Sequence, residues 1–187
     1  MRIVRIFILS LLSIFSATAQ DPDTAILEQV VKHYYKNEKP VYKNRSQLLY
    51  MYCEKPNNNE ELFETVNALK LPAAEVKKIR HQVTTDVKPE NWQQSLDKIF
   101  ETDKSQLAIK INQCQSVEGY HEKRKVLNLN NQRLMIVSKP VFYANGSRAL
   151  IKVVFYRSIE HNSGSVVQMQ KVGDKWQIKD FLNEWST

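Results

Sequence analysis

The spacing of apolar residues changes near Leu134, and this change limits what the chain can fold into more than any other feature. Before Leu134, apolar residues recur every three or four positions, which is typical of amphipathic helices. After it, they alternate with polar residues, which is typical of strands with one buried face. The chain is therefore predicted to be α+β, with several N-terminal helices packed on one face of an antiparallel β-meander of four or more strands.

Four helices are predicted before this change. The first begins at Asp23 or Thr24, either of which can cap it, and ends before Pro40. Three short helices follow in series, because a capping residue or a proline precedes each helically spaced apolar stripe. They begin after Asn59, at Pro72 and at Pro89.

Three shorter segments complete the first part of the chain. Residues 47–53 are apolar and aromatic, and their spacing fits either a strand or a buried turn of helix. The run from Ala108 to Asn112 is predicted as a strand. The densest basic cluster, from His121 to Lys125, is predicted as a solvated loop. The net charge of +7 is otherwise spread along the chain, so no nucleic-acid partner is predicted.

The strands are delimited by turn residues. The first runs from Leu134 through Tyr143, and Pro140 within it requires either an edge position or a bend. Asn145-Gly146 is a strong turn signal. Three more strands are predicted over 149–157, 166–172 and 176–182, with turns at 161–164 and 173–174.

Alternation within these strands separates a buried side from a wet side. The apolar set is expected to form the core beneath the helices: Ala149, Ile151, Val153, Phe155, Val167, Met169, Trp176, Ile178 and Leu182. The opposite side is expected to face water and carries Lys152, Tyr156, Gln168, Gln170, Gln177 and Lys179.

The first 19 residues have the three parts of a secretory signal peptide. Arg2 and Arg5 precede an apolar stretch from Ile6 to Phe15, and small residues follow it, ending at Ala19. The apolar stretch is shorter than the ~20 residues that span a bilayer, so stable membrane insertion after cleavage is not expected; an uncleaved anchor is the alternative. We predict a leader over 1–19, a single α+β domain over 20–187, and a periplasmic or secreted location.

Cys53 and Cys114 are candidates for a disulfide. An oxidising compartment makes their pairing plausible, and two buried free thiols are the alternative.

No pattern in the chain predicts catalytic chemistry. Neither the HExxH nor the CxxC spacing occurs, and no phosphate-binding glycine loop or dinucleotide fingerprint is present. No catalytic residue, metal ligand or cofactor is therefore predicted. Six aromatic residues either pack in the core and at its rim or line a cleft or sugar platform: Tyr50, Tyr52, Tyr143, Tyr156, Trp176 and Trp185.

Several stretches of the C-terminal part resemble an uncharacterised family of small exported bacterial proteins. They are Ile136 to Phe142, Ala149 to Phe155, Lys171 to Ile178 and Trp185-Ser186. This resemblance implies export and a C-terminal antiparallel meander, and it implies no activity. The hairpin from Gly173 to Ile178 is also similar to hairpins of nuclear-transport-factor-like α+β folds, which pack helices into a curved sheet.

Three functions agree with these features. The first is a non-enzymatic binding or accessory module with a protein or small-molecule partner in the bacterial envelope. The second is a small hydrolase or lyase with its site in a cone-like cavity, which would need a deep pocket with ionisable side chains in contact. The third is an inhibitor-type partner of another secreted protein, which would need an exposed apolar patch.

Overall fold

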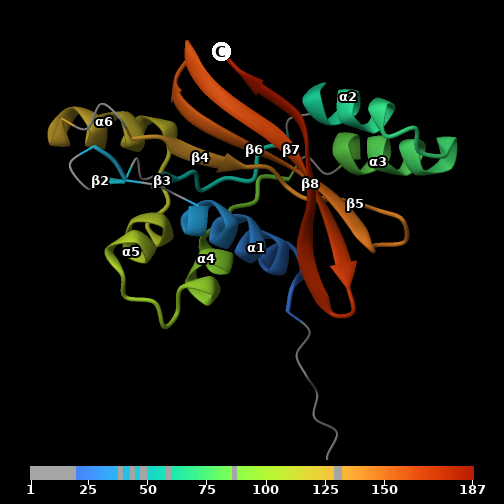
Figure 1. Cartoon of the computed structure of the whole chain (residues 1–187), viewed down its shortest axis with the longest axis horizontal. Coiled ribbons are helices and arrows are strands. Elements are labelled where there is room, and N and C mark those ends of the chain that lie inside the picture. The colour runs from blue at the N-terminus through green and yellow to red at the C-terminus, as the bar shows by residue number, and fades with distance from the viewer. Residues whose placement is uncertain are drawn as a thin grey trace, which may run out of the picture.

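The protein has the predicted α+β class, with helices in its first part and most of its sheet in the last part (Figure 1). The structure, a computed structural model, describes residues 20–37, 40–42, 45–46, 50–57, 60–85, 88–128 and 132–187. The predicted leader and the possible cap Asn59 lie outside these ranges.

The described residues form six α-helices. They are α1 (Pro22–Asn37), α2 (Glu60–Ala68), α3 (Ala73–Thr85), α4 (Gln93–Ile99), α5 (Gln106–Asn112) and α6 (Val117–Leu127). The first starts slightly earlier than predicted, because the Asp21 carboxylate accepts a hydrogen bond from the Thr24 backbone N–H at 3.2 Å. Pro72 immediately precedes α3, as expected, whereas the helix predicted from Pro89 begins only after Trp92.

Two of these helices contradict the sequence-based interpretation. The predicted strand from Ala108 to Asn112 is helical, because Ser105 accepts a hydrogen bond from the Ala108 N–H and caps α5. The basic cluster from His121 to Lys125 lies within α6 instead of a loop. Ser116 caps α6 in the same way, and Asn128 ends it in the left-handed conformation, with φ 48°.

The main sheet has the strand order β3-β4-β6-β7-β8, with β5 also paired to β6. Its strands are β3 (Tyr50–Met51), β4 (Leu134–Val137), β5 (Val141–Tyr143), β6 (Arg148–Ser158), β7 (His161–Val172) and β8 (Lys175–Ser186). Two short strands, β1 (Pro40–Tyr42) and β2 (Arg45–Ser46), pair separately. β3 runs parallel to β4, so residues 50–51 form a strand and not a turn of helix; the other pairs are antiparallel.

Pro140 has the effect predicted for it. β4 and β5 pair with successive parts of β6, and the ladder is interrupted between them at residues 138–140. The turn at Asn145-Gly146 is also confirmed, and both residues have positive φ. The predicted turn over 161–164 is wrong, because residues 161–164 belong to β7. The turn between β6 and β7 is formed by Ile159 and Glu160.

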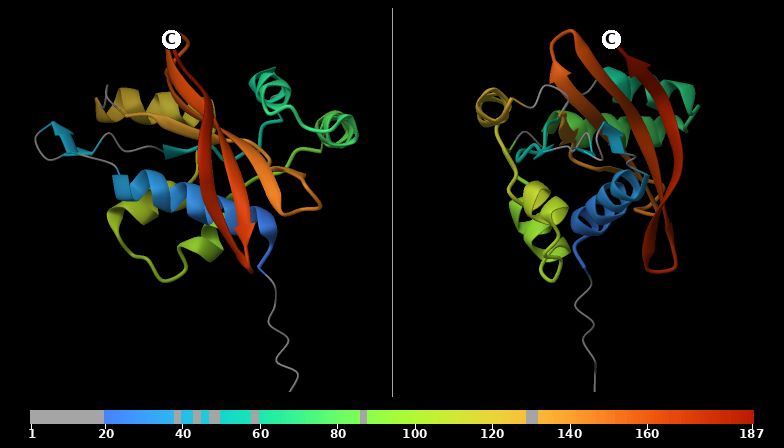
Figure 2. Two further views of the ribbon diagram at one scale, coloured as in Figure 1. Left: turned by 45° about the vertical axis from the view of Figure 1, so that its right-hand side comes forward. Right: turned by 60° about the vertical axis from the view of Figure 1, so that its left-hand side comes forward.

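Helices cover both faces of the sheet, and not one face as predicted (Figure 2). On the first face, α1, α4 and α5 pack against one continuous core that includes Ile151, Val153 and Trp176. On the second face, α2 and α3 pack against a smaller core around Leu150 and Val166. A third cluster joins Tyr120 of α6 to Tyr50 and Leu134 on the same second face.

The second face is therefore wet only in part, since Gln177 and Lys179 are exposed as expected. Lys152 and Gln168, both expected in water, are only 5% and 4% exposed. Trp176 and Phe155 pack against the same core on the first face, as the alternation predicts.

Two bulges shift the alternation along the outermost strand, β8. Gln168 pairs with Asp180 and Met169 with Ile178, so Lys179 is an extra residue and Leu182 turns to the second face. Leu182 therefore does not share a face with Trp176 and Ile178 as predicted. A second irregularity, between the pairs Val166–Leu182 and Gly164–Trp185, accompanies a positive φ at Asn183.

The predicted disulfide is confirmed. Cys53 and Cys114 are bonded, and they join the segment after β3 to the segment between α5 and α6.

Candidate binding groove

A groove of about 400 Å³ opens on the second face of the sheet, between the N-terminal turns of α2 and α6. The two helices flank the long strands on opposite sides in Figure 1. The floor is formed by β4 and β6, which contribute Ile136, Lys152, Val154 and Tyr156. Its volume is in the range of sites that hold small organic molecules. We call this cavity the sheet groove.

An ion pair between a buried lysine and a partly exposed glutamate lies in the sheet groove. Lys152 points to the second face from the middle of β6, and its Nζ lies 2.6 Å from Glu61 Oε2. Glu61 is in the first turn of α2. Partial burial works to raise the pKa of Glu61, but the Lys152 ammonium and the residue's own backbone N–H hold that pKa below its ordinary value. Glu61 is therefore held in its charged form.

Aromatic side chains line the remainder of the sheet groove. They are Tyr52 after β3, Tyr156 of β6 and Trp185 of β8. The Tyr156 hydroxyl lies 3.1 Å from His121 Nε2, and the Tyr52 hydroxyl donates to Glu54 at 3.0 Å. The Trp185 ring centroid is 5.7 Å from Lys152 Nζ, so the ion pair adjoins an aromatic surface.

The position of Trp185 depends on the absence of a side chain at residue 164. A Cβ at Gly164 would lie 2.7 Å from Cζ2 of Trp185 and 2.8 Å from the Val153 carbonyl oxygen. Any larger residue would have to displace the indole ring or the β6 backbone. Gly164 therefore permits the close packing of β7 and the Trp185 ring.

Besides Glu61 Oε2, which has the Lys152 ammonium beside it, two polar atoms of groove-lining residues are buried without a hydrogen-bond partner in the described part of the chain. They are Asn162 Oδ1, an acceptor, and Trp185 Nε1, a donor. A buried polar atom without a partner costs about 1–3 kcal/mol. The sheet groove thus has unsatisfied hydrogen-bonding capacity of both kinds at the end formed by β7 and β8.

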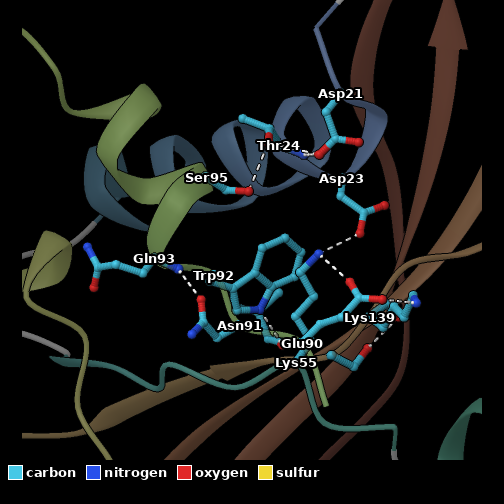
Figure 3. Close-up of polar contacts among 12 residues, drawn as sticks. Asp21, Asp23, Thr24, Lys55, Glu90, Asn91, Trp92, Gln93, Ser95 and Lys139 are labelled. Carbon is cyan, nitrogen blue, oxygen red and sulfur yellow. Dashed lines mark hydrogen bonds and ion pairs between the residues drawn. The ribbon is translucent and has the colours of Figure 1, made fainter. Parts of the chain in front are cut away.

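A second set of charged residues, on α1 and the segments beside it, is satisfied internally (Figure 3). Lys55 Nζ lies 2.8 Å from Asp23 and 3.0 Å from Glu90, which also pairs with Lys139. The Lys55 ammonium lies 4.3 Å from the ring centroid of Trp92. These pairs join α1, the segment after β3, the segment before α4 and the β4–β5 connection. Their geometry supports a structural role.

Burial and pairing act against each other in this network. Burial raises the pKa of Asp23, and the Lys55 ammonium offsets only part of the rise. Burial also works to lower the pKa of Lys55, but its hydrogen bonds to Asp23 and Glu90 carry that pKa above its ordinary value. The Lys139 ammonium is the main cause that lowers the pKa of Glu90.

The structure divides the six aromatic residues singled out in the sequence. Tyr50, Tyr143 and Trp176 are buried in the three hydrophobic clusters, whereas Tyr52, Tyr156 and Trp185 line the sheet groove. Sequence reasoning missed Glu61, Lys152 and Asn162 as site residues. Lys152 gave one usable signal, because it is a lone charge within the apolar run 149–155.

Metal binding and membrane crossing receive no support from the described residues. Among them, no three His, Cys, Asp or Glu side chains form a group that could hold a metal ion. Within the same ranges, no helix has the length and apolarity needed to cross a bilayer.

Comparison with protein-family models, with curated proteins and with solved structures finds no match to this chain.

Proposed function

We propose that the protein is a non-enzymatic binding module that acts in the periplasm or outside the cell. Its ligand is a neutral, hydroxyl-rich organic molecule such as a saccharide, bound in the sheet groove. The observation that carries this proposal is the ion pair of the buried Lys152 with Glu61 beside the Trp185 ring.

The charges in the sheet groove favour a neutral ligand. Lys152 and Glu61 compensate each other, so a ligand with a net charge would disturb a balanced pair. An ammonium and a carboxylate side by side offer a donor and an acceptor, and a hydroxyl group can bond to both. The aromatic surface of Trp185 suits the apolar face of a sugar ring.

Two further features support action outside the cytoplasm. The sequence pattern of residues 1–19 predicts a leader, and the Cys53–Cys114 disulfide is compatible with an oxidising compartment. We also propose that the protein is related to the small exported bacterial proteins that its C-terminal part resembles.

The test is calorimetric titration of the protein with a panel of neutral mono- and disaccharides, and with glucuronate and glucosamine as charged counterparts. We expect at least one neutral sugar to bind, and Lys152→Met and Trp185→Ala each to weaken it about tenfold or more. Lys179→Met changes the same residue type at an exposed site on β8 and should leave the affinity unchanged. The proposal is overturned if no neutral sugar binds or if the two groove variants bind as the wild type does.

A small hydrolase or lyase in the same groove is the second candidate. The contact between two ionisable side chains favours it. Two observations speak against an enzyme. The Lys152 ammonium lowers the pKa of Glu61, so the Glu61 carboxylate is a weak base. Ser138 Oγ already accepts a hydrogen bond from the Lys152 backbone N–H at 2.8 Å. Product analysis after long incubation with each bound sugar separates the two functions. Conversion that disappears in Glu61→Gln would establish the enzyme.

A further inference from the structure

A second cavity lies on the opposite, first face of the sheet, between α1 and the outer strands. Its volume is about 330 Å³, and we call it the aromatic pocket. α1 packs against β8, as Figure 2 shows, and both elements contribute residues to the pocket. The side chains that matter for its chemistry are His33, Tyr34, Phe155, Phe181, Glu184 and Trp185.

The rings of the aromatic pocket contact each other at varied angles, such as 39° for His33 and Phe181 and 76° for Tyr34 and Phe155. Tyr34 meets Phe155 edge to face, with ring centroids 4.7 Å apart and planes at 76°. Its plane makes 71° with that of Phe181, at 6.4 Å. His33 lies 5.0 Å from Phe181. Rings from α1, β6 and β8 therefore lie close together around one small space.

The Tyr34 ring is held in place by contacts at its polar end. Its hydroxyl is hydrogen-bonded to Ser165 of β7. Burial is the main cause that raises the pKa of this hydroxyl, and the negative charge of Glu184 raises it further. Glu184 is itself one of the residues that line the pocket, at an exposed position on β8.

The charge of the aromatic pocket differs from that of the sheet groove. Among the described residues that line it, Glu184 is the one carboxylate, and lysine and arginine are absent. Aromatic faces carry negative quadrupole potential, which attracts cations. The described lining of the pocket thus combines several aromatic rings with one carboxylate.

We infer that the aromatic pocket binds a methylated ammonium group, as in choline or a trimethylated amine. Such a group has no N–H donors, so it does not need the several acceptors that a primary ammonium requires. Its charge is spread over methyl groups that pack against aromatic faces, and Glu184 at the rim balances it. This inference does not depend on the sheet groove, although Trp185 borders both cavities.

The experiment compares choline with its neutral isostere, 3,3-dimethylbutan-1-ol, by chemical-shift titration of the full protein. The two probes have the same shape and differ in charge. We expect choline to bind about tenfold more tightly, because cation–π attraction and Glu184 act only on the charged probe.

Two variants locate the bound probe. Phe181→Leu keeps apolar volume and removes one π face, and it should weaken choline about fivefold. Glu184→Gln removes the carboxylate at an exposed position and should weaken choline about threefold. Lys152→Met, in the sheet groove, should change choline binding less than either of these variants. Circular dichroism of each variant confirms that the fold is retained.

Three results would overturn the inference. One is equal affinity for choline and the neutral isostere, which shows an apolar pocket without cation recognition. Another is loss of choline binding in Lys152→Met with no change in Phe181→Leu, which places the probe in the sheet groove. The third is an absence of choline shifts up to millimolar concentration.

Discussion

The two faces of the sheet are covered differently. On the first face, α1, α4 and α5 pack onto one continuous core with Trp92 and Leu96 fully buried. On the second face, α2 and α3 cover one end, α6 covers the other, and the sheet groove lies between two separate clusters. The comparison suggests that the continuous core supplies more of the stability, with its cavity confined to the edge beside β8, whereas the divided face leaves the sheet groove between its two clusters.

Removing the disulfide should have the largest effect. Cys114 packs against the continuous core, and the bond closes a long loop. By the chain-entropy account, the double variant Cys53→Ala/Cys114→Ala should lose about 4 kcal/mol of unfolding free energy. Urea denaturation of the variant and the oxidised wild type measures the loss. A loss under about 1 kcal/mol would contradict the prediction.

Adjacent residues of β6 allow a direct comparison of the two faces. Ile151 points to the first face and Leu150 to the second, and both are fully buried. Truncation to alanine should cost about 4 kcal/mol at Ile151 and about 3 kcal/mol at Leu150, because the smaller core can relax around the cavity more readily. Denaturant midpoints of both variants test this. A larger cost at Leu150 would reverse the assignment of stability to the first face.

Breaking the ion pair should have a moderate effect that is confined to the second face. Lys152→Met leaves Glu61 without its partner and should cost about 2 kcal/mol, less than for a fully buried pair because the Glu61 side chain is 26% exposed. Adding Glu61→Gln removes the orphaned charge and should restore about half of the loss. Strictly additive costs in a double-mutant cycle would show that the two residues do not interact.

Acidification should have the smallest effect. Because the pKa of Glu61 is lowered in the folded protein, its ion pair stabilises the fold above the ordinary carboxyl pKa, and that stabilisation is lost as the pH falls through the folded value. Between pH 7 and about pH 3, Glu61→Gln should therefore lose less stability than the wild type, by under about 1 kcal/mol. Urea curves at both pH values provide the measurement, and equal losses in the two proteins would refute it.

The first face could be predicted from the sequence and the second only in part. The alternation in β6 is uninterrupted from Ile151 through Val153 to Phe155, and Trp176 begins the same pattern in β8. Their common face therefore follows from the sequence pattern. Leu182 breaks that pattern because Lys179 forms a bulge, and a bulge adds one residue without a sequence signal of its own.

The sheet groove was beyond sequence reasoning for a different reason. Its ion pair joins residues 61 and 152, which are brought together only when α2 packs on the sheet. Lys152 was expected in water because a charged residue on alternate strand positions usually faces solvent. The caps of α5 and α6, by contrast, were readable: Ser105 and Ser116 precede helices that were instead interpreted as a strand and a loop.

The two bulges of β8 also affect how one copy of the protein meets another. An unpaired outer strand of this length could recruit a strand from a second molecule and so start aggregation. The ladder of β8 is irregular at two places, and Lys175, Lys179, Asp180 and Glu184 put charges of both signs along it. An approaching strand could neither pair with β8 in a regular register nor avoid these charges. This edge is therefore protected against sheet-to-sheet association.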